Sequence, residues 1–271
     1  MTTSETHYAV VTGGGSGLGR ALCLRLAADG WTIAVCDRNE QTAKETCRLV
    51  EQAGGRAKPH LLDVTEPEQW LALRERLQAE WPRLDLLANN AGVSAGGEAA
   101  AMCLDDWQFV LDVNLYGPIH GCQTFIPWLI ENPGRGHILN TASLAGLISA
   151  PGMGPYNVSK AGVVALSETL YSELKRKGVG VTVLCPGFFA TNLLTEGRFP
   201  AEAYRKAGRA YMDQSRFTAD DVARLAVRAM HRKRLYVVHD YRARALWRLK
   251  RLAPTSFHRL VTRLYHRTIK R

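Results

Sequence analysis

The sequence predicts an α/β fold: a doubly wound parallel sheet of about seven strands, with a basic helical extension at the C-terminal end. Short apolar runs alternate with helical patterns, and a glycine-rich loop joins the first run to the first helical pattern. Arginines beside apolar stripes after residue 240 predict the extension. The strand-like runs are Tyr8–Val11, Thr32–Cys36, Ala57–Leu62, Leu84–Ala88, His137–Leu139, Val181–Cys185 and Leu235–Val238.

The length and composition fit one large domain followed by the extension. The chain has 271 residues, 46% of them hydrophobic, which suffices for one large core. We expect residues 1–240 to form this domain, with 188–216 as a long insert after a strand end, and 241–271 to form the extension. No apolar run approaches the roughly 18 residues of a membrane span.

Threonines at three positions have the pattern of helix caps. Thr65 and Glu68 have the spacing of a capping box, as do Thr218 and Asp221. In the extension, Pro254 is expected to end one helix and Thr255 to cap the next.

The glycine loop after the first strand is typical of a dinucleotide site. Glycines there let the backbone turn tightly and let a pyrophosphate approach the N–H groups at the start of a helix. The alternative is a plain glycine-rich turn. The residues proposed to bind the dinucleotide are Gly13, Gly15, Ser16, Gly17, Leu18 and Gly19.

The end of the second strand bears on the choice between NAD and NADP. Asp37 lies eighteen residues after Gly19, near the place where a carboxylate accepts hydrogen bonds from an adenosine ribose and repels a 2′-phosphate. Arg38 favours NADP, because a guanidinium can pair with that phosphate. We expect NAD to be preferred, with NADP as the alternative. An ordinary turn residue or helix cap is the other interpretation of Asp37.

Tyr156 and Lys160 are four residues apart in a helical pattern and project from one face. A free phenol has a pKa of about 10, and a nearby ammonium is expected to lower it. The pair could then exchange a proton between an alcohol and a carbonyl. An isolated match to this spacing is more often a pair of solvated neighbours.

Together these motifs resemble the classical short-chain dehydrogenase/reductase family. The matching residues span about 180 positions in the family's order: the loop Thr12–Gly19, Asp63 with Val64, Asn89 to Gly92, Asn114, Ser143, Tyr156 with Lys160, Pro186 with Gly187, and Thr191. The resemblance implies a Rossmann-type fold for residues 1–240 and a nicotinamide cofactor. It also implies a catalytic tetrad of Asn114, Ser143, Tyr156 and Lys160.

The resemblance assigns roles to the remaining matches. Asp63, next to Val64, would contact adenine; Asn90, Ala91 and Gly92 would form a shelf under the adenosine; and Pro186, Gly187 and Thr191 would hold the carboxamide. Asn114 would bend its helix and anchor a water leading to Lys160, and Ser143 would position the substrate oxygen. Without the family context, Ser143 could be a turn serine and Asn114 a helix-surface asparagine.

These residues predict an NAD(P)-dependent oxidoreductase that interconverts a secondary alcohol and a ketone. The expected substrate is apolar: lipid-like, steroid-like or acyl. A cofactor-sensing protein with little turnover, or a protein that docks on a membrane or partner, is the alternative. The candidate lining residues are Leu144, Leu147, Met153, Phe188, Phe189, Leu193, Leu194 and Phe199.

Charge is concentrated at the C-terminal end. The net charge is +10; residues 216–271 carry 16 lysines and arginines and three acids, or +13, which leaves −3 elsewhere. The apolar stripe from Phe257 to Ile269 favours packing on the same or a sister subunit, with a basic amphipathic helix on an anionic membrane as the alternative. No recognition motif points to nucleic acid.

The remaining expectations concern environment and assembly. The six cysteines are scattered, which favours packed thiols in a reducing cytoplasm and no metal site. Residues 1–6 lack the basic and apolar segments of a secretory signal. We therefore expect a cytoplasmic protein, with peripheral contact at the inner membrane surface left open. The resemblance implies a homodimer or homotetramer.

Overall fold

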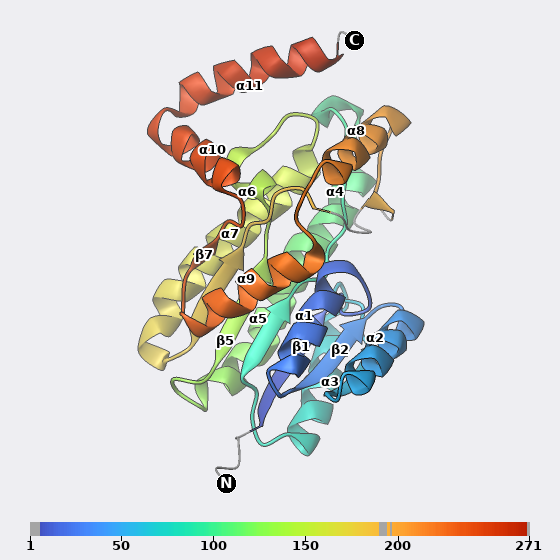
Figure 1. Cartoon of the computed structure of the whole chain (residues 1–271), viewed down its shortest axis with the longest axis vertical. Coiled ribbons are helices and arrows are strands. Elements are labelled where there is room, and N and C mark those ends of the chain that lie inside the picture. The colour runs from blue at the N-terminus through green and yellow to red at the C-terminus, as the bar shows by residue number, and fades with distance from the viewer. Residues whose placement is uncertain (1–5, 190–193, 196, 270–271) are drawn as a thin grey trace.

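The computed structural model describes residues 6–189, 194–195 and 197–269. Its described strands form one parallel sheet in the order β3-β2-β1-β4-β5-β6-β7, which confirms the predicted α/β fold (Figure 1). The strands are β1 (His7–Thr12), β2 (Trp31–Asp37), β3 (Arg56–Leu61), β4 (Leu86–Asn89), β5 (His137–Thr141), β6 (Gly180–Leu184) and β7 (Tyr236–Val237).

Helices connect the strands and continue beyond the last one. Their bounds are α1 (Gly17–Ala28), α2 (Glu40–Gln52), α3 (Pro67–Glu80), η1 (Ala99–Ala101), α4 (Leu104–Leu111), α5 (Gly117–Ile130), α6 (Leu144–Ile148), α7 (Gly154–Leu174), η3 (Lys175–Lys177), α8 (Glu202–Asp213), α9 (Ala219–His231), α10 (Tyr241–Leu252) and α11 (Pro254–Ile269). A π-helical turn, η2 (Asp112–Tyr116), joins α4 to α5.

Alternating strand residues build a core on each face of the sheet. Val11 belongs to a cluster with residues of α1, α2 and α9. Its neighbour Val10 belongs to a cluster with residues of α3, α5 and α7 on the other face. This alternation follows from the two-residue period of a strand, and both faces are apolar because helices cover both.

The strand order reverses between β1 and β4, and the predicted site follows from this reversal. Neighbouring connections run in opposite directions from such a point and leave a crevice at the carboxyl ends of the strands. The glycine loop follows β1, Asp37 ends β2, and Asn90 follows β4. Segments that are far apart in the sequence therefore meet at one edge of the sheet.

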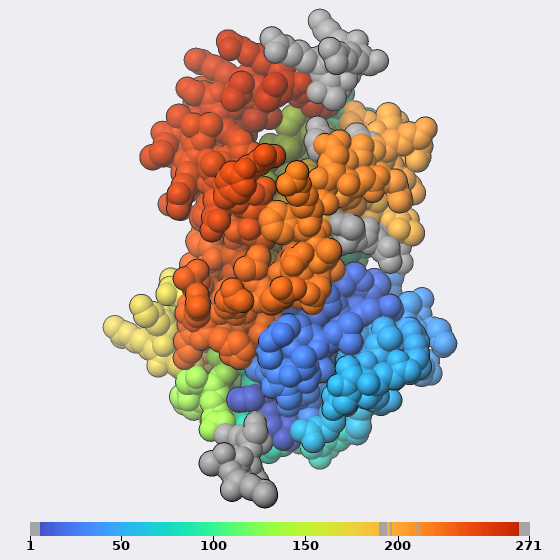
Figure 2. Space-filling model, in the orientation of Figure 1, coloured from blue at the N-terminus to red at the C-terminus, as the bar shows by residue number. Residues whose placement is uncertain are grey.

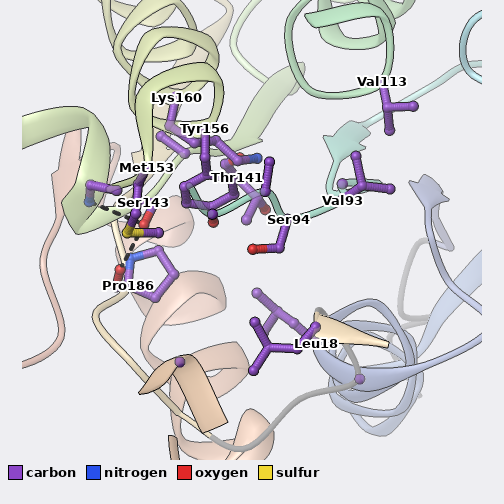
Figure 3. Close-up of a pocket in the computed structure, with 18 of the residues that line it drawn as sticks. Leu18, Val93, Ser94, Val113, Thr141, Ser143, Met153, Tyr156, Lys160 and Pro186 are labelled. Carbon is purple, nitrogen blue, oxygen red and sulfur yellow. Dashed lines mark hydrogen bonds between the residues drawn. The ribbon is translucent and has the colours of Figure 1, made fainter. Parts of the chain in front are cut away.

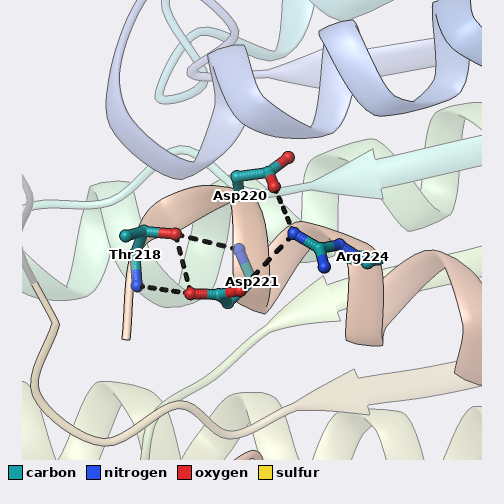
Figure 4. A network of polar contacts seen from close by, with 4 residues as sticks. All are labelled: Thr218, Asp220, Asp221 and Arg224. Atoms are coloured by element: carbon teal, nitrogen blue, oxygen red, sulfur yellow. Dashed lines mark hydrogen bonds and ion pairs between the residues drawn. The ribbon is translucent and has the colours of Figure 1, made fainter. Parts of the chain in front are cut away.

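Only one of the three predicted helix caps is present. The Thr218 hydroxyl accepts from the Asp221 N–H at 3.2 Å and the Asp221 carboxylate accepts from the Thr218 N–H at 3.1 Å, and Arg224 pairs with Asp220 (Figure 4). The capping box at Thr65 is wrong. Helix α3 begins at Pro67, so Glu66 takes the N-cap position, and the Thr65 hydroxyl donates to Asp63.

Thr255 does not cap the last helix. Helix α10 ends at Leu252, as Pro254 predicts, but Pro254 is itself the first residue of α11, so Thr255 lies inside its first turn. Proline suits this position because its fixed φ fits the helix and the first turn needs no N–H from it.

The extension lies at one end of the molecule, beyond the carboxyl ends of the strands (Figures 1 and 2). Helix α10 packs on α6, and α11 on α10. No helix among the described residues is long and apolar enough to cross a membrane. Five of the six cysteines are buried, as expected of packed thiols, and Cys103 is exposed.

Thr218→Ala should lower the free energy of unfolding by about 1 kcal/mol, because it removes the acceptor for an N–H group at the start of α9. Thr255→Ala is the matched control, since both threonines have the sequence pattern of a cap but only Thr218 acts as one. Denaturant unfolding of both variants measures the difference. Equal losses would contradict the assignment of caps.

Candidate active site

A cavity of roughly 1340 Å³ lies at the carboxyl ends of the strands, at the point where the strand order reverses. Its wall includes residues from every predicted cofactor segment that the structure describes. Figure 3 shows Tyr156, Lys160 and Thr141 grouped on one side, with Leu18 of the glycine loop across the cavity. The cavity is therefore long enough to join the glycine loop to the predicted tetrad.

The glycine loop packs too closely for side chains. Gly13 has φ +62°, and a Cβ on Gly19 would lie 1.9 Å from the Gly13 carbonyl oxygen. Gly13, Ser16, Gly17 and Leu18 line the cavity. Ser16 makes no side-chain cap on α1, so the N–H groups at the start of this helix remain available to a bound anion.

Gly15 and Gly19 are not in the cavity wall. Gly15 packs against Asp37 and Thr42, where a Cβ would lie 2.2 Å from the Thr42 hydroxyl oxygen. The absence of a side chain at Gly15 allows the loop to lie against β2 and α2, and the contact of Gly15 and Gly19 with a cofactor stays a prediction.

Asp37 anchors this loop. Its Oδ2 accepts from the Gly15 N–H at 2.9 Å, and its Oδ1 accepts from the Asn39 N–H at 3.0 Å. Both Asp37 and Arg38 line the cavity. The carboxylate therefore sits beside the glycine loop at the end of the cavity that the sequence assigns to the adenosine.

The predicted adenosine shelf is held by β1. The Thr12 hydroxyl accepts from the N–H groups of Asn90, at 2.9 Å, and Ala91, at 3.0 Å. Asn90, Ala91 and Gly92 line the cavity, as do Asp63 and Val64. Thr12 is therefore a positioning residue; it belongs to the glycine-loop motif but was not among the predicted site residues.

Asn114 lies in the π-helical turn and is fully buried. Its Oδ1 accepts from the Val93 N–H at 2.8 Å, and its Nδ2 donates to the Val93 carbonyl at 2.9 Å and to the Ser159 hydroxyl at 3.2 Å. The π-turn is the helix distortion that the sequence analysis expected at this position. A role in anchoring a water stays a prediction.

Tyr156 and Lys160 lie one turn apart on α7 and are both buried. The Lys160 ammonium is 5.8 Å from the centre of the Tyr156 ring and donates to the Thr141 carbonyl at 2.9 Å. Ser143 caps α6 by accepting from the Ala145 N–H. Thr141, which fixes Lys160, was missed because the carbonyl at a strand end has no sequence signal.

The expected lowering of the Tyr156 pKa is not found. Burial raises the pKa of Tyr156 to about 12, because the charged phenolate loses its water, and a hydrogen bond with Ser143 only partly opposes this. Burial also lowers the pKa of Lys160 to about 8. The spacing of Tyr156 and Lys160 in the sequence does not show that both groups are buried, and burial disfavours the charged form of each.

Pro186 and Gly187 line the cavity, and the Gly187 N–H donates to Nδ1 of His239 at 3.2 Å. His239 lies just after β7, and burial lowers its pKa, which favours the neutral ring that can accept here. Thr191, predicted with Pro186 and Gly187, lies outside the described residues. His239 was missed because nothing near it in the sequence belongs to a site motif.

Most of the predicted substrate-lining residues lie in the cavity wall: Leu144, Met153, Phe188, Phe189, Leu194 and Phe199. Leu147 was wrong, because it points into the core beside Val163 and Val164. Leu193 lies outside the described residues. The wall also includes three residues of α11 that the prediction missed: Val261, Leu264 and Tyr265.

These residues fit a dinucleotide. The glycine loop has no room for side chains, because an added Cβ would clash with neighbouring atoms. The start of α1, which has no side-chain cap, lies at the cavity, and the carboxylate of Asp37 lies at one end of it. Gly13, Ser16, Gly17 and Leu18 would hold the pyrophosphate side. Among the described residues, no group of three or more His, Cys, Asp or Glu side chains is arranged to hold a metal ion.

The comparisons with known proteins agree with this geometry. The model of the short chain dehydrogenase family matches residues 7–200. A crystal structure of a short chain dehydrogenase/reductase from Burkholderia phymatum in complex with NAD is similar, with a TM-score of 0.85 and 34% identity over 93% of this chain and 95% of that one.

Two curated relatives come from Mycobacterium tuberculosis. A protein named as probable oxidoreductase EphD is 38% identical over 191 residues, which are 70% of this chain but 32% of EphD, so the chain spans about a third of that relative's length. A protein named as an oxidoreductase, SadH, is 31% identical over 265 residues, 96% of each chain.

The stability of the protein should depend on pH through Lys160. Its pKa is about 8 in the folded protein and about 10.4 in an unfolded chain, so between these values the unfolded state binds more protons and the free energy of unfolding rises with pH. Lys160→Met removes this titration. The melting temperature of the wild type, relative to the variant, should therefore increase from pH 7 to pH 10, by an amount equivalent to roughly 2–3 kcal/mol.

Tyr156 is present in both proteins, so its titration cancels in this comparison. Lys175→Met, at an exposed position of η3, controls for the general loss of an amine. A melting-temperature difference for Lys160→Met that stays constant over this pH range would contradict the burial of an ionisable amine.

Proposed function

Since the chain belongs to the short-chain dehydrogenase family, we propose that it interconverts a secondary alcohol and a ketone on an apolar substrate, with Tyr156 transferring the proton. The family consists of oxidoreductases that use NAD or NADP and act on CH–OH groups. The observation that carries the proposal is the burial of Tyr156 and Lys160 together in the wall of a cavity that also contains the glycine loop.

The bound nicotinamide would accept or give the hydride, and the chain's own residues handle the proton. In reduction the Tyr156 hydroxyl donates its proton to the forming alkoxide, and in oxidation the phenolate accepts it. With a pKa of about 12, Tyr156 is neutral at pH 7, the form required of a proton donor. Ser143 lies beside it and would hold the substrate oxygen.

Lys160 is proposed to support Tyr156 in two ways. Its ammonium is held by the Thr141 carbonyl near the Tyr156 ring, where its charge would stabilise a phenolate. It is also proposed to donate to the nicotinamide ribose. Its pKa of about 8 means that it is mostly protonated at neutral pH and loses this charge in mild base.

NAD is the proposed preferred cofactor. Asp37 lies beside the glycine loop, where its negative charge would repel a 2′-phosphate and accept from ribose hydroxyls. Arg38 lies next to it in the wall and keeps NADP as the alternative.

The substrate part of the cavity supports an apolar substrate. Phe188, Phe189 and Phe199 come from the insert 188–216, which is proposed to close over the substrate, and Met153 and Leu144 come from the α6–α7 region. The proposed division into a catalytic domain, residues 1–240, and a C-terminal extension, 241–271, follows the charge distribution. A homodimer or homotetramer is proposed from the family resemblance, and a cytoplasmic location from the scattered cysteines.

The rival proposal is a protein that binds the cofactor and has little turnover. It is less well supported because all four tetrad residues are present, and three of them, Ser143, Tyr156 and Lys160, line the cavity. A panel of apolar secondary alcohols and ketones with NAD and NADP distinguishes the two proposals.

Tyr156→Phe should reduce kcat at least about 10²-fold on any substrate found in this panel, because it removes the proton donor and keeps the ring. Binding of NAD, measured by fluorescence titration, should change little. Tyr171→Phe on the same helix removes a hydroxyl outside the cavity wall and is the matched control. Activity of Tyr156→Phe within tenfold of the wild type would refute the mechanism.

Asp37→Asn should raise the ratio of kcat/KM for NADP to that for NAD by about tenfold or more, because losing some 1.4 kcal/mol of repulsion is a factor of ten. Asparagine keeps an acceptor for the Gly15 N–H, which holds the glycine loop, and gives up only the bond from the exposed Asn39 N–H. Asp29→Asn, beyond the end of α1, is the control for a change of net charge. An unchanged ratio would mean that Asp37 does not face the ribose.

A further inference from the structure

Helix α10 presents leucines to solvent instead of to the core. Its inner side packs on the body of the protein: Ala243 is buried, Trp247 packs against the α6–α7 cluster, and Lys250 donates to the Leu147 carbonyl at 2.8 Å. By the 100° advance per residue of a helix, Leu252 lies opposite Ala243, Leu249 lies about 120° from it, and Leu246 lies on the flank at about 60°. These three leucines are 86%, 44% and 41% exposed.

Helix α11 borders the cavity with its apolar side. Phe257 is buried, whereas Leu260, one turn along, is 47% exposed. Val261, Leu264 and Tyr265 line the cavity, and the Tyr265 hydroxyl lies 3.3 Å from a Glu98 carboxylate oxygen. Figure 2 shows a recess between the extension and the segment that contains α8. The extension is thus both a wall of the substrate cavity and a surface with exposed leucines.

The net positive charge of the chain is concentrated in residues 241–271, and eight of the ten bases of this segment belong to α10 and α11. Residues 241–271 contain ten lysines and arginines and no acid, whereas residues 1–240 contain 25 of each sign. In α10, Arg244, Arg248 and Arg251 follow one another along the helix, beside the line of exposed leucines. A surface that combines bases without acids and exposed leucines is complementary to an anionic surface with an apolar interior.

We propose that α10 and α11 dock on an anionic lipid bilayer, and that the apolar substrate passes from the bilayer into the cavity along α11. The passage of substrate rests on the proposed function, because it assumes an apolar substrate, whereas the docking on a bilayer does not. The exposed leucines enter the acyl boundary and the arginines pair with lipid phosphates, each base strengthening binding about fivefold.

A second copy of the chain is a poorer occupant of this surface. A two-fold interface would place the same patch of each copy against the other, so the arginines of α10 would face the same arginines of the second copy. Such like-charge contact opposes association, whereas the same charges favour an anionic bilayer.

The test is co-sedimentation of the full chain with vesicles, either phosphatidylcholine alone or mixed with phosphatidylglycerol. We expect binding to the mixed vesicles, little binding to phosphatidylcholine, and weakening as salt is raised from about 0.05 to 0.5 M. Leu249→Asp should weaken binding tenfold or more. Leu71→Asp is the matched control, because Leu71 is 45% exposed on α3, away from the extension.

The charge is tested in the same assay. Arg248→Ala should weaken binding about fivefold at low salt, and Arg176→Ala in η3, at the amino end of the sheet, should not. Failure to bind mixed vesicles, or equal losses for Leu249→Asp and Leu71→Asp, would overturn the proposal. So would a wild-type dimer that Leu249→Asp converts to a monomer while vesicle binding is kept.

The outcome is independent of the proposed catalytic function. Tyr156→Phe should bind vesicles as the wild type does, and Leu249→Asp should retain wild-type turnover of a water-soluble alcohol in the absence of vesicles. A loss of vesicle binding in Tyr156→Phe would count against the docking surface and leave the catalytic proposal untouched.

Discussion

The amide of Asn114 is the contact that the candidate active site depends on. It pairs with both the N–H and the carbonyl of Val93, just after β4, and donates to Ser159 of α7. The Ser159 hydroxyl in turn donates to the Tyr156 carbonyl at 2.9 Å. One buried side chain therefore joins the shelf beside β4 to the helical turn that carries Tyr156. A buried backbone group without a partner would cost about 1–3 kcal/mol. The hydrogen bonds of Asn114 to Val93 avoid this cost, which explains why the helix contains a π-turn at this position.

Burial of Tyr156 and Lys160 holds the two side chains in place, but it also disfavours the charged form of each. Lys160 is held among packed elements: a Cβ on Gly146 would lie 2.5 Å from the Lys160 carbonyl oxygen, so α6 lies directly on α7. Burial makes the ammonium of Lys160 easier to deprotonate and the phenol of Tyr156 harder to ionise. The resting arrangement therefore keeps Tyr156 protonated.

The sequence predicted the sheet and most of the cavity wall because these rest on local signals. Glycines, strand ends and the Tyr156–Lys160 spacing can each be read within a few residues. The wrong or missed predictions have two causes: neighbouring residues whose local signals compete, and contacts between segments that are far apart in the sequence. Thr65 has the spacing of a helix cap, but Pro67 makes the helix start one residue later. Leu147 is close in sequence to Leu144, which lines the cavity, but its side chain packs in the core. His239 and Thr141 act through single hydrogen bonds between distant segments, for which no local pattern exists.

The extension shows why composition and packing can divide a chain differently. By charge, the chain separates at about residue 240, with a neutral part before and a basic part after. The cavity wall, in contrast, combines both parts: Val261 and Tyr265 come from the basic extension, and Met153 and Tyr156 come from the part before residue 240. The periodicity of α11 predicted an apolar side correctly, but periodicity cannot say what such a side faces. Because that side borders the cavity, we expect changes in the extension to alter the shape of the candidate site as well as the surface of the protein.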